Sequence, residues 1–118
     1  MKSLNQVQLI GNLTKDPELK QTKSGNSVVT FTIATSRSVK SGDVWDEETD
    51  FHNVIIWGKL AETVQQYVSK GQKLFVTGRL QNRSYDKDGI KRYVTEVVGT
   101  DIVFMDSKKQ SQDVVLED

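Results

Sequence analysis

The sequence of 118 residues contains no cysteine and one histidine, His52. Without cysteine the chain cannot form disulfides, thiolate metal sites or a cysteine nucleophile. With one histidine a multi-histidine metal site is impossible, and a catalytic triad could be built only around His52. These shortages disfavour most enzyme chemistries, and we expect no cofactor.

Long apolar runs and proline are also scarce. No hydrophobic stretch approaches the roughly 20 residues that span a bilayer, and the first residues lack the pattern of a secretion signal. With one proline, 36% hydrophobic and 27% charged residues, the composition is typical of an ordinary globular domain. We therefore expect a cytoplasmic protein with one domain at residues 1–106 and a short polar, acidic tail at residues 107–118.

The charges are separated along the chain, although their formal sum is zero. Residues 70–95 carry seven basic and two acidic residues, a net charge of +5, and residues 96–118 carry two basic and six acidic residues, a net charge of −4. A local positive field can attract phosphate groups, but such runs also occur on solvated faces. The acidic cluster at residues 43–50 lacks the spacing of a calcium loop, and we interpret it as a solvated loop.

Hydrophobic alternation and turn residues predict five strands and one helix. The strands are expected at residues 5–13, 28–36, 49–57, 73–83 and 90–105. Helical spacing predicts a helix over residues 59–69 that Gly71 ends, and Asp88 with Gly89 predicts a hairpin turn. Residues 14–27 are expected to be a loop or a loose strand continuation, and residues 36–48 a long hairpin connection. This order predicts an all-β fold with one helix, the OB-fold: a five-stranded Greek-key barrel with the helix between strands 3 and 4. A small sandwich is the alternative, but it leaves the helix without a place.

Alternation within the strands separates core from surface candidates. In the strand over residues 49–57, Val54 and Ile56 point to one side together with His52, which we expect to be a buried or interface histidine. In the strand over residues 73–83, Leu74, Val76 and Leu80 are expected to point inward. Tyr67 falls on the apolar stripe of the helix, where core packing is expected.

The remaining aromatic and basic residues form a candidate binding surface. Phe51 and Trp57 share the other side of their strand, and Tyr85 lies in the basic stretch, although burial in the core is the alternative for Phe51 and Trp57. For Trp45, local packing and base stacking are both open. Stacking of an aromatic ring on an unpaired base contributes ~1–3 kcal/mol, and a duplex hides its base faces. The predicted DNA-binding residues are Phe51, Trp57, Tyr85, Trp45, Lys73, Arg79, Arg83, Lys87, Lys91, Arg92 and Arg37.

Five segments resemble bacterial single-stranded DNA-binding proteins over roughly residues 4–105: LIGNLTKDPEL, FTIATSRS, ETDFHNVIIWGKLAE, YVSKGQKLFVTGRL and DGIKRYVTEVV. The resemblance implies an OB-fold homotetramer that wraps single-stranded DNA in replication, recombination and repair, without catalysis. It also implies a nucleoid-associated location. The family's stacking aromatics match Phe51, Trp57 and Tyr85.

Two departures from the family pattern limit what the resemblance implies. A further stacking tryptophan of the family corresponds to Val39, and Trp45 is a candidate replacement in the same hairpin. The family also carries a Gly/Pro/Gln-rich linker and an acidic tip that recruits genome-maintenance proteins, whereas residues 107–118 read SKKQSQDVVLED. The recruitment of such partners is therefore not carried over to this chain.

The sequence alone leaves three alternative functions open. A primosomal accessory protein or an RNA-binding OB-fold protein would share the surface described above. A metal-dependent nuclease could be built on the carboxylates at residues 43–50. A pure assembly subunit would form oligomers without affinity for nucleic acid.

Overall fold

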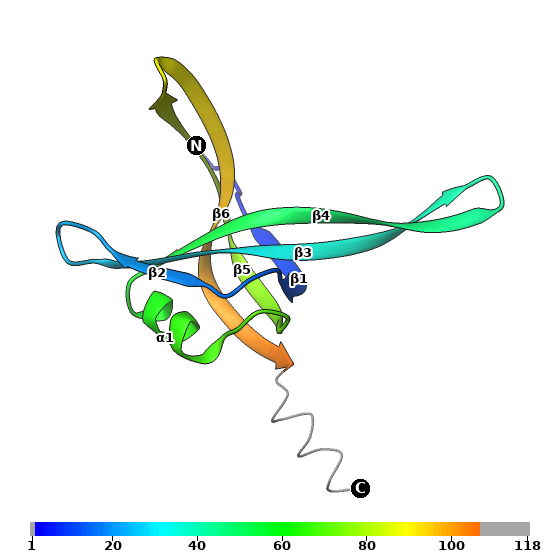
Figure 1. The fold of residues 1–118 in the computed structure, drawn as a ribbon, viewed down its shortest axis with the longest axis horizontal. Coiled ribbons are helices and arrows are strands. Elements are labelled where there is room, and N and C mark those ends of the chain that lie inside the picture. The colour runs from blue at the N-terminus through cyan, green and yellow to red at the C-terminus, as the bar shows by residue number, and fades with distance from the viewer. Residues whose placement is uncertain (1, 107–118) are drawn as a thin grey trace, which may run out of the picture.

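The computed structural model describes residues 2–106 and shows a six-stranded sheet that curls into a barrel (Figure 1). The elements are β1 (Val7–Leu13), β2 (Glu18–Gln21), β3 (Ser27–Ser41), β4 (Val44–Trp57), α1 (Lys59–Tyr67), β5 (Lys73–Lys87) and β6 (Ile90–Asp106). The strand order is β1-β5-β6-β4-β3-β2, and an additional pairing of β1 with β3 closes the barrel. All pairs are antiparallel except β4 with β6.

Closure of the barrel depends on Gly11 in β1. The strand pairs with β5 along most of its length, and its last residues, Asn12 and Leu13, also pair with β3. A Cβ atom at Gly11 would collide with the carbonyl oxygen of Ala34 and the side chain of Ile33. The close approach of β1 to β3 therefore requires a residue without a side chain.

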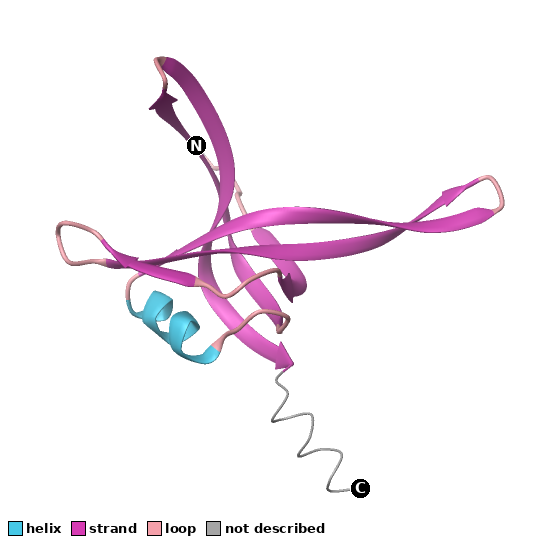
Figure 2. Cartoon of the chain, viewed as in Figure 1, coloured by secondary structure: helices cyan, strands magenta, loops and turns pink. Residues whose placement is uncertain are grey.

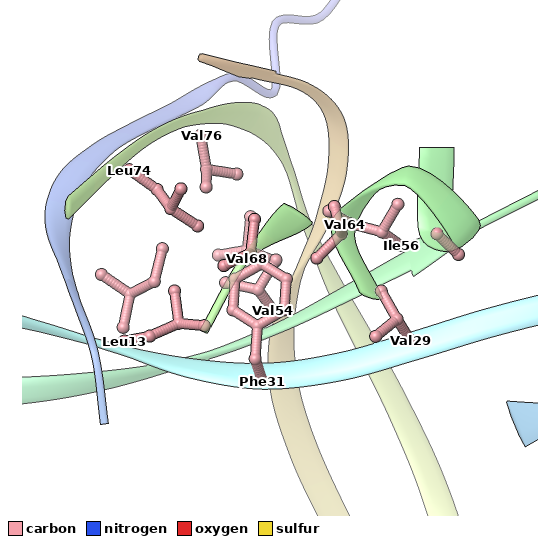
Figure 3. Packing of buried hydrophobic residues seen from close by; sticks show 12 residues of the cluster. Leu13, Val29, Phe31, Val54, Ile56, Val64, Val68, Leu74 and Val76 are labelled. Atoms are coloured by element: carbon pink, nitrogen blue, oxygen red, sulfur yellow. The ribbon is translucent and has the colours of Figure 1, made fainter. Parts of the chain in front are cut away.

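The core is made by one face of each barrel strand and by the helix. Buried side chains converge from β1, β3, β4, β5, β6 and the segment that includes α1 (Figure 3). Val54 and Ile56 are buried as the alternation predicts, and so are Leu74 and Val76. The strand pattern therefore predicted the core face of β4 and the first half of β5 correctly.

Helix α1 contacts β2, β3 and β4 and contributes Ala61 and Val64 to the core. The helix ends at Tyr67, two residues earlier than predicted, and Gly71, with φ +90°, lies in the turn that follows. Tyr67 was expected in the core, but its side chain is exposed and its ring lies 6.4 Å from that of Phe104. The core prediction for Tyr67 is wrong because the buried stripe runs through Ala61, Val64 and Val68, and Tyr67 lies beside that stripe, on the exposed side of the helix.

The prediction of a long loop at residues 36–48 is also wrong. Strands β3 and β4 stay paired to Ser41 and Val44, so that only Gly42 and Asp43 connect them. Residues 36–41 and 44–50 form a two-stranded arm, here called the β3–β4 ribbon, that projects away from the barrel (Figure 2). Gly42 has φ +64° at the first turn position, as a type II′ hairpin turn requires. The sequence did not predict these strand residues because neither face of the ribbon enters the core, so the ribbon shows no apolar alternation.

A second arm leaves the barrel between β5 and β6. Asp88 and Gly89 connect the strands with φ +53° and +75°, so the predicted turn is confirmed, and residues 82–95 are here called the β5–β6 hairpin. Leu80 was expected to point inward but is exposed. The prediction is wrong because β5 leaves the barrel soon after Gly78, the last of its buried residues.

The five strands β1, β3, β4, β5 and β6, with the helix between β4 and β5, confirm the predicted OB-fold. The short strand β2 extends the sheet at the edge of β3, within the segment expected to be a loop or a loose strand. Helix α1 is too short and too polar to cross a membrane. The predicted tail at residues 107–118 lies outside the described residues.

Candidate nucleic-acid interface

Three exposed aromatic residues lie in a row on the outer face of β4. Trp45, Phe51 and Trp57 are separated by an even number of residues, so they share a face, and their side chains are 65%, 65% and 47% exposed. Val54 and Ile56 face the core from the alternate positions. Strand alternation thus presents flat rings outward while the same strand contributes its other face to the core.

Trp45 stands near the tip of the β3–β4 ribbon. It pairs with Lys40, whose ammonium lies 5.6 Å from the centre of the Trp45 ring. Val39 pairs with Asp46 and is half-buried on the opposite face of the ribbon. The structure therefore brings Trp45 into one row with Phe51 and Trp57, and it does not place Trp45 where Val39 points.

Arg37 is engaged by two carboxylates of the neighbouring strand. Its guanidinium donates to Glu48 at 2.9 Å and also to Asp50. These residues lie on the ribbon face opposite the aromatic row. The interpretation of residues 43–50 as a loop is wrong, because most of them belong to β4, and part of their charge balances Arg37.

Tyr85 lies on the β5–β6 hairpin and is 45% exposed. Arg83 lies two residues away on the same side, with its guanidinium carbon 5.8 Å from the centre of the Tyr85 ring. Lys87 shares this side by alternation, and Arg92 is the cross-strand partner of Tyr85. One side of the hairpin therefore carries an aromatic ring among three cations.

The other predicted cations are distributed less uniformly. Lys91 pairs with Asp86 on the opposite side of the hairpin from Tyr85. Arg79 is exposed on the same side of β5 as Arg83. Lys73 begins β5, ten residues from Arg83, or about 33 Å along an extended strand. The structure thus brings Arg79, Arg83, Lys87 and Arg92 to one side and leaves Lys73 and Lys91 apart from them.

A hollow of ≈ 270 Å³ separates β3 and β4 from the base of the β5–β6 hairpin. Its lining includes polar residues that the sequence did not single out: Lys15, Glu18, Thr30, Thr32, Asn53 and Glu96. Arg83, a predicted site residue, also lines it. The hollow therefore connects the outer face of β3 and β4 with the cationic hairpin.

Two residues near the predicted surface were not identified as candidates from the sequence. Tyr93 is 77% exposed on the side of the hairpin opposite Tyr85, and Glu96 is buried. A signal for Glu96 existed, since a glutamate between Val94 and the valines at 97 and 98 must be buried or break the strand pattern. No comparable signal marks Tyr93, because both sides of the hairpin are exposed.

His52 is half-buried, and its Nε2 lies 2.8 Å from the hydroxyl of Thr35. A partly buried histidine whose ring nitrogen is hydrogen-bonded agrees with the expectation of a buried or interface histidine. Among residues 2–106, no group of three histidine, aspartate or glutamate side chains is placed to hold a metal ion.

A second exposed surface lies on the outer face of β1, β5 and β6. Ile10 pairs with Phe75, and Phe75 pairs with Val103, so these three side chains form one stripe across the strands. Ile10 and Val103 are exposed and Phe75 is half-buried. A contiguous apolar stripe on a sheet face is typical of a protein contact surface.

Comparison with known proteins agrees with this geometry. The model of the Single-strand binding protein family matches residues 4–105. Single-stranded DNA-binding protein 1 of Chlorobaculum tepidum is 48% identical over 111 residues, which cover 91% of this chain and 68% of that protein. Single-stranded DNA-binding protein 2 of Staphylococcus aureus is 46% identical over 110 residues, which cover 92% of this chain and 78% of that protein.

Among solved structures, the chain is similar to that of the Plasmodium falciparum SSB in its complex with ssDNA. The TM-score is 0.83 and the sequence identity 27%, and the match covers 90% of this chain and 98% of the other. The resemblance found in the sequence is therefore confirmed at the level of both family and fold.

Proposed function

Because the chain belongs to the single-strand binding protein family, we propose that it binds and protects single-stranded DNA without sequence preference during replication, recombination and repair. The observation that carries the proposal is the row of Trp45, Phe51 and Trp57 on the exposed face of β4. These rings are exposed to water and free to stack on the bases of a bound strand.

The rings supply affinity that does not depend on the base. Every unpaired base offers a flat face to Phe51, Trp57 or Tyr85, and each stacked base contributes ~1–3 kcal/mol. Paired bases are already stacked within a duplex, so the same rings find little to contact there. Selectivity for single strands follows from this difference.

The cations hold the phosphate backbone. Arg79, Arg83, Lys87 and Arg92 share a side with Tyr85 and form the main phosphate track of the proposal. Lys73, Lys91 and Arg37 are assigned peripheral contacts, because they lie away from that side or are paired with carboxylates. The part of the chain that binds DNA is proposed to be residues 1–106, and this activity places the protein on the nucleoid.

Assembly into a homotetramer is part of the proposed function. The stripe of Ile10, Phe75 and Val103 offers an apolar surface on the side of the barrel strands that faces away from the core. Contact between copies through this face would remove the stripe from water and leave the two arms free for DNA.

Intrinsic fluorescence provides a direct test, because both tryptophans of the sequence, Trp45 and Trp57, lie in the proposed site. Poly(dT) is expected to quench the emission strongly and a duplex of equal length hardly at all. Equal quenching by both, or by neither, contradicts the proposal. Competition between DNA and RNA oligonucleotides of matched sequence then separates a DNA-binding from an RNA-binding role.

A further inference from the structure

Glu96 is the one buried charged side chain among residues 2–105, with 6% of its surface exposed. A carboxylate removed from water is strongly unfavourable unless charged or polar partners compensate it. The proposed phosphate track assigns no role to Glu96. A negative charge beside a surface for DNA even opposes binding by simple Coulomb repulsion.

The partners of Glu96 lie on β5. Arg83 Nε donates to Glu96 Oε1 at 2.7 Å, and Gln81 Nε2 lies 3.3 Å from the same oxygen. The Arg83 guanidinium also lies 5.8 Å from the ring of Tyr85. Glu96, Arg83 and Tyr85 therefore form a contact chain that runs from the buried base of the hairpin to its exposed ring.

The geometry leaves Arg83 able to bind a second group. A guanidinium has five N–H donors, and the bond to Glu96 uses the one on Nε. The side chain of Arg83 is half-exposed and lines the hollow of ≈ 270 Å³ beside β3 and β4. Its terminal nitrogens can thus reach a phosphate while Nε remains bound to Glu96.

We propose that Glu96 is a positioning residue for single-stranded DNA, one that fixes the Arg83 guanidinium beside the Tyr85 ring and presents its terminal N–H groups to a phosphate. This inference rests on the proposed function. Fixing the long side chain before binding removes part of the entropy that Arg83 would otherwise lose on contact with DNA. Positioning and repulsion therefore predict opposite effects of removing the carboxylate.

The test uses Glu96→Leu, which removes the hydrogen-bond acceptor, and Glu96→Gln, which removes the charge and keeps an acceptor. At fixed salt, Glu96→Leu is expected to weaken binding of a dT oligomer about tenfold, and Glu96→Gln to retain most of the affinity. In the Arg83→Met background, Glu96→Leu is expected to cause no further weakening. A Glu96→Leu protein that binds as tightly as the wild type, or an equal loss with and without Arg83, overturns the proposal.

Two controls separate positioning from other effects. Asp46→Asn removes one exposed carboxylate from the ribbon face opposite the aromatic row and is expected to leave affinity unchanged or slightly raised. Heteronuclear NMR of the wild type needs no variant: the Arg83 Nε–H signal should be protected before DNA is added and remain protected in the complex. Loss of this protection on binding overturns the proposal even if Glu96→Leu fails to fold. A wild type that does not bind dT oligomers refutes the proposed function itself, which is a different outcome.

Discussion

Val39 and Trp45 lie on opposite faces of the β3–β4 ribbon, because Val39 pairs with Asp46 while Trp45 pairs with Lys40. Trp45 therefore cannot supply a ring at the place to which Val39 points. It continues the row of Phe51 and Trp57 instead, with a separation of six residues, or about 20 Å, between successive rings.

We expect Trp45→Ala to weaken binding only when the DNA is long enough to reach the tip of the ribbon. For such an oligomer the loss should be ~1–3 kcal/mol, the contribution of one stacked base. A short oligomer that covers only the barrel should bind the variant and the wild type alike. Titrations with dT oligomers of increasing length measure the difference. Trp45→Phe, which keeps a ring, is the matched control, and an unchanged affinity for long oligomers would assign Trp45 to local packing.

Trp57→Ala should weaken binding of all dT oligomers by ~1–3 kcal/mol and leave the melting temperature nearly unchanged, since the ring lies at the surface of the barrel. The adjacent Ile56 is fully buried and provides the contrast. Ile56→Ala should cost about 2–5 kcal/mol of folding free energy because it leaves a cavity. Thermal melts and binding titrations on both variants check the separation. Collapse of the fold in Trp57→Ala would show that the ring is structural.

The salt dependence of binding should distinguish free cations from paired ones. Log affinity is expected to fall linearly with log salt, with a slope of ~0.7 for each phosphate neutralised. Lys87→Gln should lower the slope by about that amount. Arg37→Gln should lower it less, because a phosphate must compete with Glu48 and Asp50 for the guanidinium. Equal changes for the two variants would mean that Arg37 leaves its carboxylates and contacts DNA directly.

Gly11→Ala should destabilise the barrel without a selective effect on the DNA surface. The added methyl group would overlap the carbonyl oxygen of Ala34 and the side chain of Ile33, where β1 meets β3. Overpacking of this kind typically costs about 1–3 kcal/mol. Urea denaturation measures the loss, and Gln8→Ala on the same strand, where the side chain is exposed, is the control. An unchanged midpoint would show that β1 can shift to accept the methyl group.

Sequence reasoning succeeded where one face of a strand enters the core. Val54 and Ile56 alternate with Phe51 and Trp57, so a single pattern predicted both the interior and the exposed rings. The turn at Asp88 and Gly89 was equally readable, because a turn with positive φ at both central residues strongly favours the Asp-Gly pair.

It failed where both faces of an element are exposed. The β3–β4 ribbon has no apolar face, so its charged residues resembled a loop, and Leu80 resembled a core residue although β5 had already left the barrel. Contacts between residues far apart in the sequence could not be predicted either. The bond between Arg83 and Glu96 depends on the register of β5 against β6, which no local pattern contains.

Copies of the chain are expected to assemble through the outer face of β1, β5 and β6. In Phe75→Asp a charge would stand between Ile10 and Val103, in the middle of the apolar stripe. Burying that charge between two copies costs several kcal/mol for each copy, so the assembly should dissociate. Light scattering is expected to give a mass of several copies for the wild type and a much smaller mass for Phe75→Asp. Val44→Asp places the same charge at the exposed ribbon tip and should leave the mass unchanged. If Phe75→Asp keeps the wild-type mass, the contact between copies lies elsewhere on the chain, and the stripe must be covered in another way.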